Sequence, residues 1–222
     1  MIVVAGLLAE ARLASSPGVR AIAAGGDAVR LAREIERAIL DGGGALLSFG
    51  IAAGLAPELV PGTLVVASRV VAREEHYATD PAWSSRLRQA LPQSVEGVLA
   101  GVDAPLATAS AKRALAEATG AVAADMESHL AARAAARRSL PFAVLRAIAD
   151  AAGRALPAAA LVGLRGDGRM DLPAVAGALV RRPSEFAAVL GVAADARTAL
   201  KALRNARRVL GRSGELAPQS RR

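Results

Sequence analysis

Residues 121–150 read AVAADMESHLAARAAARRSLPFAVLRAIAD, and this stretch decides the fold class. The apolar runs over 121–126 and 142–150 have the composition of buried strands. Residues 127–138 between them have a helical pattern, and Pro141 follows the end of that pattern. Alternation of strand, helix and strand predicts an α/β sandwich.

The same alternation continues outward toward the N-terminus. Helical patterns cover residues 27–40, behind Asp27 as the cap, and 109–119, which Gly120 closes. Further strands are predicted at 2–6, 19–23, 45–50, 63–71 and 98–102. We therefore expect a single catalytic domain over residues 1–210.

Composition excludes several classes of protein. Of 222 residues, 53% are hydrophobic and 22% are charged, which fits a chain with a large core and excludes a disordered one. Aromatic residues are 2%, which argues against a protein that stacks nucleic-acid bases. The chain has no cysteine, so disulfides and thiolate chemistry are excluded. We expect no nucleic-acid partner and a cytoplasmic protein.

The C-terminal quarter supplies +7 of the net charge of +8, because residues 165–222 hold 12 basic and 5 acidic side chains. A helix is predicted from about 184 to 210, and residues 211–222 are predicted to form a basic, disordered tail. This helix has an apolar stripe and a basic stripe. The apolar stripe contains Phe186, Val189, Leu190, Ala193, Ala196, Leu200 and Leu203. The basic stripe contains Arg197, Lys201, Arg204 and Arg208. The basic face either meets water or makes peripheral contact with the inner membrane.

Acidic residues stand at the ends of three predicted strands, where ligands bind in open α/β sheets. Glu10 follows the first strand, Asp125 and Glu127 follow the strand at 121–126, and Asp150 ends the strand at 142–150. The competing explanation for Asp125 and Glu127 is capping of the following helix. For Asp150 it is capping of a following turn, and for Glu10 it is a surface position on a short helix. The loop at 50–54 is rich in small residues, so a ligand could approach its backbone.

Several carboxylates without metal-spaced histidines suit the cleavage of a sugar C–N or C–O bond, where positive charge develops on ribose. One acid protonates the leaving group, a second carboxylate binds sugar hydroxyls, and a third orients water. We expect no metal site, since His76 and His129 lack acidic neighbours at ligand spacing.

Three motifs together resemble one family. They are GIAAGLAPELVPGTLVV at 50–66, DMES at 125–128 and PFAVLRAIAD at 141–150. Their order and spacing are similar to those of the nucleoside phosphorylase and 5′-methylthioadenosine/S-adenosylhomocysteine nucleosidase superfamily over most of residues 1–155. The resemblance implies a three-layer α/β/α sandwich with a central mixed sheet, assembled as a homo-oligomer.

Within that superfamily the chain most resembles the hopanoid-associated phosphorylases, which remove adenine from adenosylhopane. The segment at 125–129 and the segment from Asp167 to Pro183, with the long terminal helix that follows it, carry this closer resemblance. The function implied is release of adenine from adenosylhopane. Two alternatives stay open at this point: a nucleosidase for methylthioadenosine or adenosylhomocysteine, and a nucleoside-binding protein without turnover.

The resemblance also implies roles for individual residues. Asp150 would donate a proton to adenine N7, Glu127 would accept hydrogen bonds from the ribose 2′ and 3′ hydroxyls, and Glu10 would activate water. Met126 would pack against the sugar and the base. The remaining residues of the implied substrate site are Asp125, Phe49, Gly50, Ile51 and Ala52.

The sequence leaves hydrolysis and phosphorolysis open. Ile51 stands where the nucleosidases usually have a serine, and no arginine precedes Gly50 as it does in many phosphorylases. No organic cofactor is expected, but phosphate could serve as a co-substrate. Its binding groups would be Arg12, Arg73 or backbone amides of the Gly50 loop.

Overall fold

The structure is a computed structural model and describes residues 1–24, 26–163 and 168–218. Its strands are β1 (Ile2–Ala5), β2 (Arg20–Ala23), β3 (Leu46–Gly54), β4 (Leu64–Ala72), β5 (Glu75–Ala78), β6 (Val95–Gly101), β7 (Ala123–Asp125) and β8 (Phe142–Asp150). Its helices are α1 (Leu8–Ala14), α2 (Ala28–Leu40), α3 (Pro81–Ala90), α4 (Ala109–Thr119), α5 (Ser128–Arg137), α6 (Ala158–Leu161), α7 (Leu172–Arg181), the 3₁₀ helix η1 (Pro183–Glu185) and α8 (Phe186–Ser213).

The strands form one mixed sheet in the order β2-β1-β3-β7-β6-β4-β5, with β8 paired to both β3 and β4. β8 is parallel to β3 and antiparallel to β4, and β7 is antiparallel to β3. The five strands β3, β8, β4, β6 and β7 therefore pair in a closed ring. The predicted mixed sheet is confirmed.

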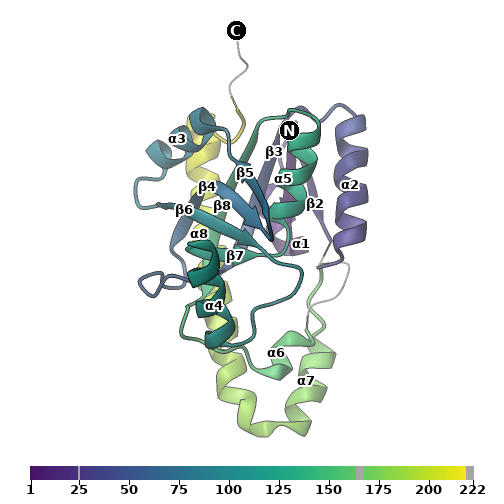
Figure 1. Ribbon diagram of the computed structural model, residues 1–222. Helices are drawn as coiled ribbons and strands as arrows, with labels where there is room; N and C mark the ends of the chain where they lie inside the picture. Colours follow the sequence, from purple (N-terminus) through teal and green to yellow (C-terminus); the bar gives the residue numbers. More distant parts are fainter. Residues whose placement is uncertain (25, 164–167, 219–222) are drawn as a thin grey trace.

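Helices cover both faces of the sheet (Figure 1). On one face, α2 and α5 bury apolar residues such as Leu31, Ile35 and Ala131 in one core cluster. On the other face, α8, α3 and α1 bury Leu203, Trp83 and Ala14 in a second cluster. Two cores separated by a sheet make the three-layer α/β/α sandwich that the resemblance implies.

Strand β3 is longer than the sequence indicates. The small residues at 50–54 predict a loop after the strand, but they continue β3 and pair with β8 up to Asp150. The small side chains that indicate a loop are needed here for close approach to β8. The pairing shifts register between Ala52 and Ala53, which bends the strand near its end.

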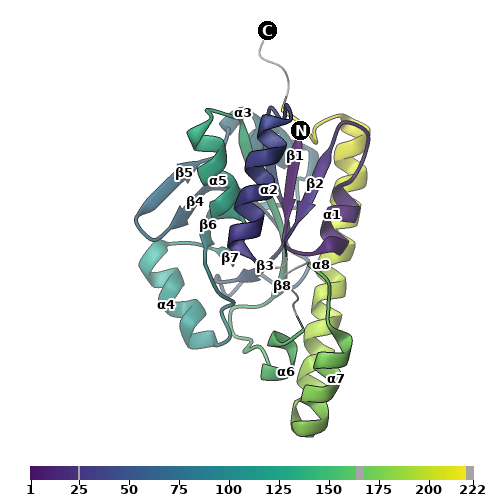
Figure 2. The same cartoon turned by 90° about the vertical axis from the view of Figure 1, so that its right-hand side faces the viewer.

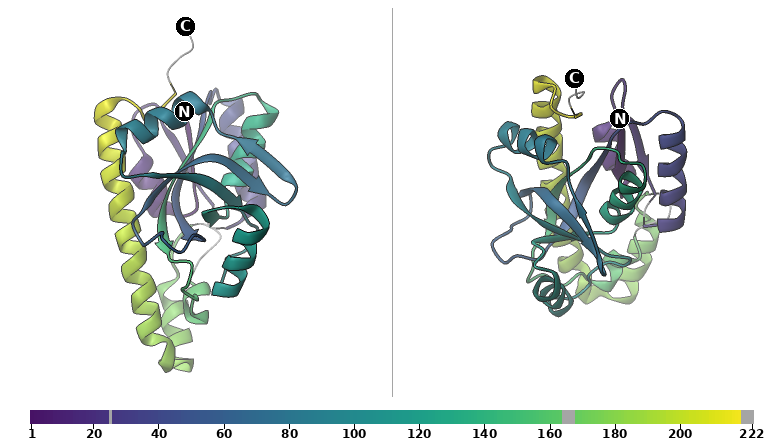
Figure 3. Two further views of the ribbon diagram at one scale, coloured as in Figure 1. Left: turned by 60° about the vertical axis from the view of Figure 1, so that its left-hand side comes forward. Right: turned by 45° about the horizontal axis from the view of Figure 1, so that its top comes forward.

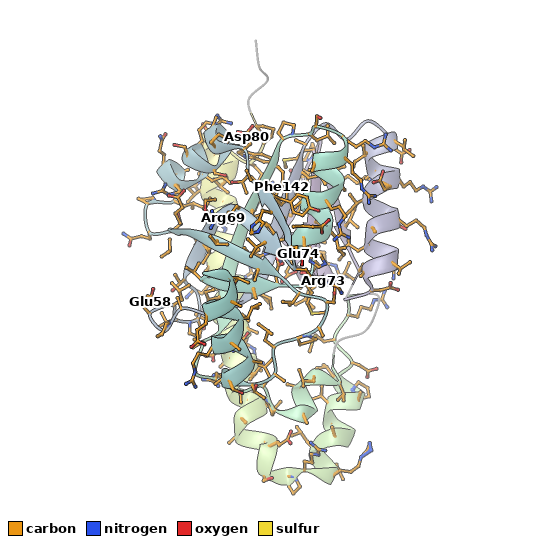
Figure 4. The ribbon with its side chains drawn as sticks, in the orientation of Figure 1. Glu58, Arg69, Arg73, Glu74, Asp80 and Phe142 are labelled. Atoms are coloured by element: carbon orange, nitrogen blue, oxygen red, sulfur yellow. The ribbon has the colours of Figure 1, made fainter. Side chains whose placement is uncertain are left out.

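Several short elements have no counterpart among the sequence predictions. They are α1, β5, α3, α6 and α7. α3 begins after Asp80 (Figure 4), whose carboxylate accepts a hydrogen bond from Trp83 N at 2.8 Å. α7 begins in the same way, because Asp171 accepts one from Ala174 N at 3.0 Å. Caps of this kind stabilise the first turn of a helix.

Helix α8 runs along one side of the molecule and continues beyond the sheet (Figure 3). Its buried face consists of Ala199, Leu203, Ala206 and Leu210. The apolar stripe predicted from the sequence is therefore not buried as a unit, because Phe186 at its start is 55% exposed. Among the described residues, no helix has the length and hydrophobicity that crossing a membrane requires.

Part of the segment predicted as a disordered tail from residue 211 is ordered. α8 continues to Ser213 and ends at Gly214, whose φ of 74° is the left-handed conformation typical of a glycine C-cap. Residues 211–214 are exposed, but Glu215 forms an ion pair with Arg86 at 2.9 Å, and Leu216 is buried. Residues 219–222 lie outside the described part of the chain.

We name the α6–α7 segment and the start of α8 the tip, because they project beyond one end of the sheet (Figures 1 and 2). The tip presents large apolar side chains to solvent. They are Leu161, Val162, Met170, Leu172, Val180, Phe186 and Leu190.

The two halves of α8 differ in how they are packed, which makes a direct test of the fold. Leu203→Ala should lower the free energy of unfolding by about 2–5 kcal/mol, because it opens a cavity in a fully buried position. Leu190→Ala on the tip is the matched control and should change it by less than about 0.5 kcal/mol. Urea denaturation of both variants measures the difference. Equal losses would contradict the packing described.

Candidate active site

Three parallel strands bring acidic side chains to one edge of the sheet. β1, β3 and β8 run in the same direction, so their carboxyl ends lie together. Glu10 lies on α1 after β1, and Asp150 ends β8. Asp125 ends β7, which pairs with the end of β3, and Glu127 follows it. All four carboxylates line a single cavity.

Glu10 is held by backbone amides from two strand ends. Oε2 of its carboxylate accepts hydrogen bonds from Gly6 N at 3.0 Å and Leu7 N at 2.8 Å, and Oε1 accepts one from Ile51 N at 2.8 Å. Burial raises the pKa of the Glu10 carboxyl, whereas Arg146 and the three amides lower it. A carboxylate with a raised pKa is a better base toward water.

Arg146 lies directly beneath the carboxylates, in the middle of β8, and has no exposed surface. Its Nη2 is 2.5 Å from Asp125 Oδ2 and 3.5 Å from Glu127 Oε2. Nη2 also donates a hydrogen bond to Ser48 Oγ at 2.6 Å. Arg146 is not among the site residues predicted from the sequence. The signal that could have found it is a lone cation inside an apolar strand, since such a charge is buried only with a partner.

Gly50 makes room for this arginine. Gly50 is the register partner of Arg146 on β3, and a Cβ atom at position 50 would lie 2.5 Å from Arg146 Nη1 and 2.7 Å from Glu10 Oε2. Both distances are too short for a side chain. Gly6 has the same relation to Glu127, whose Oε1 would be 2.7 Å from a Cβ atom. Gly50 thus lies behind Glu10, and its contribution to the cavity is indirect.

Asp125 caps α5 and also pairs with Arg146, whereas the side chain of Glu127 makes no cap hydrogen bond. Asp125 Oδ1 accepts a hydrogen bond from Ser128 N at 3.0 Å at the start of α5, while Oδ2 pairs with Arg146. Burial raises the pKa of Glu127 to about 8; Arg146 opposes this rise, and the charges of Asp125 and Glu10 add to it. Glu127 therefore holds a proton at neutral pH in the absence of a ligand.

Asp150 has a buried cation of its own. Nζ of Lys112 on α4 donates hydrogen bonds to Asp150 Oδ2 and to the backbone oxygen atoms of Ala151 and Arg154, the latter two at 2.9 and 3.0 Å. Burial raises the pKa of the Asp150 carboxyl, and Lys112 lowers it. No feature of the sequence around Lys112 points to this role, since lysines on helices normally face water.

The cavity has a volume of about 270 Å³, and its lining residues are of two kinds, acidic and apolar. The inner end holds the four carboxylates together with Met126, Ile51 and Ala52. The outer wall is apolar and comes from the loop after β6, from the segment before α6 and α6 itself, from Met170 just before α7, and from α8. It consists of Val102, Pro105, Leu106, Leu156, Ala160, Leu161, Met170, Val192 and Ala196.

One predicted substrate-site residue and the two predicted phosphate-binding arginines do not line the cavity. Phe49 is fully buried in the core cluster with Trp83 and does not line the cavity, because alternate residues of β3 face opposite sides of the sheet. Arg73, a candidate for phosphate binding, lies at the exposed turn between β4 and β5 and pairs with Asp103 at 2.9 Å (Figure 4). Arg12, the other candidate, is exposed on α1 and is not on the cavity wall.

Within the described residues, no group of three or more His, Cys, Asp or Glu side chains has an arrangement that could hold a metal ion. Asp167, one of the residues that carry the closer resemblance, lies outside the described part of the chain.

The chain matches one family model and several solved structures. The model of the phosphorylase superfamily matches residues 21–181. No curated protein matches the chain. Futalosine hydrolase of Helicobacter pylori strain 26695 has the same fold, with a TM-score of 0.64, 18% identity and coverage of 92% of this chain and 95% of that one.

Two nucleosidase structures are similar to the same degree. The 5′-methylthioadenosine/S-adenosylhomocysteine nucleosidase from Helicobacter pylori with butyl-thio-DADMe-Immucillin-A matches with a TM-score of 0.62, 17% identity and coverage of 92% and 96%. A putative 5′-methylthioadenosine/S-adenosylhomocysteine nucleosidase from Francisella philomiragia matches with a TM-score of 0.65, 16% identity and coverage of 97% and 98%. At these identities the likeness concerns the fold.

Removal of the buried guanidinium should destabilise the domain. Arg146→Met leaves Asp125 and Glu127 without their cation, and we expect a loss of about 3–5 kcal/mol in the free energy of unfolding. The matched control is Arg133→Met, which breaks the partly exposed ion pair with Glu75 and should cost less than about 1 kcal/mol. Urea denaturation at pH 7 compares the two. A similar small loss in both variants would contradict the role given to Arg146.

Proposed function

The chain belongs to the phosphorylase superfamily, and from this premise we propose that it hydrolyses the N-glycosidic bond of an adenosyl compound and releases adenine. The observation that carries the proposal is the convergence of four carboxylates on one cavity. Cleavage of this bond develops positive charge on the ribose ring, and nearby carboxylates stabilise that charge. The similarity to a futalosine hydrolase and to two nucleosidases supports a nucleoside substrate.

Three of the carboxylates take different tasks in this reaction. Asp150 donates its proton to adenine N7, and the electron pair of the C1′–N9 bond moves onto the base. Glu127 accepts hydrogen bonds from the ribose 2′ and 3′ hydroxyls. Glu10 takes a proton from the water whose oxygen forms the new bond to C1′. The proton gained by Glu10 balances the one lost by Asp150, and solvent restores both groups.

Water suits this cavity better than phosphate as the nucleophile. Among the described residues that line the cavity there is no arginine, lysine or histidine. Arg146 lies behind the wall and is already paired with two carboxylates. The Ile51 amide, a candidate phosphate donor, donates to Glu10 instead. A phosphate dianion would therefore meet carboxylates without a free cation to balance it.

The apolar outer wall favours a substrate with an apolar 5′ substituent. Adenosylhopane has one, and it is our preferred substrate. Small-molecule sites usually have volumes of ~300–1,000 Å³, so a cavity of about 270 Å³ has room for little more than the nucleoside. The hydrocarbon part would leave the cavity between Leu161 and Met170, which line it and are also exposed on the tip.

Methylthioadenosine is the second candidate substrate, because its small apolar 5′ group also fits this wall. Adenosylhomocysteine fits less well. Its amino acid group carries two charges, and the described outer wall offers them no charged partner.

A single assay tests the activity and the nucleophile together. Purified protein is given adenosylhopane in detergent micelles, methylthioadenosine or adenosylhomocysteine, in buffer with and without phosphate. We expect adenine release that is fastest with adenosylhopane and unchanged by phosphate. In ¹⁸O-water the label should appear at ribose C1, because water supplies the new oxygen. Adenine release is followed by chromatography, with Asp150→Asn as the inactive control.

Other outcomes of this assay separate the alternatives. A requirement for phosphate, with ribose 1-phosphate as product, would contradict hydrolysis. Equal or faster turnover of methylthioadenosine would favour the smaller substrate. If none of the substrates releases adenine, while isothermal calorimetry detects binding of an adenosyl ligand, the protein binds nucleosides without turnover.

We further propose that the tip docks on an anionic membrane surface, as the basic helix face predicted from the sequence also indicates. Phe186 and Leu190 on the tip lie on the same exposed face of α8 as the four cations Arg197, Lys201, Arg204 and Arg208. Successive residues of this set are three, four or seven apart, so they lie within one narrow stripe. Apolar side chains next to cations complement a bilayer with anionic headgroups.

Co-sedimentation with vesicles tests this surface. The protein should sediment with phosphatidylcholine vesicles that contain phosphatidylglycerol. Replacement of the four cations by glutamine should weaken this binding at least tenfold, since each is worth about 1 kcal/mol near an anionic surface. Phe186→Ser with Leu190→Ser should also reduce binding. Val29→Ser with Leu40→Ser is the matched control, because both residues are exposed on α2, away from the tip.

Wild-type protein that stays in the supernatant with anionic vesicles would contradict membrane docking. In that case sedimentation velocity of the protein alone shows whether a second copy covers the tip. A homo-oligomer that becomes monomeric in the Phe186→Ser, Leu190→Ser variant would assign the surface to an interface between copies.

A further inference from the structure

Lys112, like Arg146, has a completely buried cationic side chain, and its ammonium ends at Asp150, which lines the cavity. It lies on α4, and its side chain is 0% exposed. Its ammonium donates to Asp150 Oδ2 and to the two backbone oxygen atoms that follow β8, those of Ala151 and Arg154. Three acceptors thus satisfy all three N–H groups of one ammonium.

Burial of an ammonium group is costly unless its charge is balanced, so a lysine at this position needs an explanation. A helix that only had to pack on the domain would place an apolar residue here. The balancing charge is Asp150, to which the proposed reaction assigns the proton for the leaving base. The ammonium holds Oδ2, and among the described residues no hydrogen bond reaches Oδ1. The carboxyl therefore keeps one oxygen available to a ligand in the cavity.

We propose that Lys112 is a positioning residue for the general acid: its ammonium fixes the orientation of the Asp150 carboxyl and sets the pH above which the base can no longer be protonated. This inference rests on the proposed function, since it assumes that Asp150 is the proton donor. It adds a residue from α4 to a site otherwise built from strand ends.

The direction of the pH effect follows from the charges around Asp150. Lys112 faces it from α4, Arg154 from the turn after β8, and Asp195 from α8. Arg154 and Asp195 pair with each other at 3.0 Å, so their effects on Asp150 largely cancel. Loss of the ammonium therefore leaves burial unopposed and raises the pKa of the Asp150 carboxyl. The acid would stay protonated to higher pH, and the alkaline limb of the rate profile would move upward.

The test compares pH–rate profiles of wild type, Lys112→Met and Lys112→Arg, measured as adenine release. In Lys112→Met the alkaline limb of kcat should shift upward by roughly one to three pH units, the range by which a neighbouring cation changes a carboxyl pKa. The maximal kcat should fall while KM changes little, because the carboxyl is held less firmly. Lys112→Arg keeps the positive charge and should restore the wild-type limb.

A second measurement keeps the proposal testable if Lys112→Met has no measurable turnover. The Asp150 carboxyl carbon is titrated by ¹³C NMR in wild type and variant, and Asp150→Asn identifies its signal. Its midpoint should be higher in Lys112→Met. Arg113→Met is the matched control, because this cation is the next residue of α4 and is exposed. It should leave both the profile and the midpoint unchanged.

The outcomes distinguish the two proposals. If wild-type protein releases no adenine from any adenosyl substrate, the proposed function fails, and with it the role of Asp150 as acid. If wild type is active but the alkaline limb and the NMR midpoint are the same in folded Lys112→Met, the positioning role of Lys112 is overturned and the proposed function stands. A loss of thermal stability without either shift would make Lys112 a structural residue only.

Discussion

The acidic cavity depends on the buried guanidinium of Arg146. Without it, Asp125 and Glu127 would lie next to each other and to Glu10 in a dry environment, where like charges disfavour ionisation. The arginine in turn requires Gly50 opposite it on β3, because any side chain there would collide with it. The small residues of β3, the lone cation of β8 and the acidic motif after β7 therefore form one physical unit.

Elements whose stability is encoded locally could be predicted from the sequence. The strand predicted at 142–150 is observed over the same residues, because an apolar run interrupted only by Arg146 and ended by Asp150 indicates a strand buried on both faces. The helix at 27–40 is predictable from its periodicity and its Asp27 cap. β5 and α3 are not, because they are short and polar and depend on contacts such as the burial of Trp83. The end of β3 is mistaken for a loop because glycine and alanine also occur where partners approach closely.

The positions of Glu10 and Asp150 were predictable for a topological reason. β1 and β8 run parallel to β3 and end at one edge, so acidic residues there meet whatever their separation in sequence. Asp125 and Glu127 come instead from β7, which is antiparallel to the end of β3, and this pairing was not predictable in that way. The cations beneath them were not predictable in the same way, since Arg146 and Lys112 carry no local signal that names their partners. Phe49 was predicted in the site but does not belong to it. It is next to Gly50 in sequence, but because side chains alternate along β3, its ring points to the opposite side of the sheet, into the core cluster that contains Trp83.

The balance of charge in the cavity bears on the kind of reaction that it can support. Four carboxylates face two buried cations, Arg146 and Lys112. Burial raises the pKa values of Glu10, Glu127 and Asp150, so the cavity disfavours carboxylates whose charge is not balanced. In the proposed reaction a cationic ribose would balance such a charge. A phosphate dianion would instead add to the negative charge, which favours water as the nucleophile of that reaction.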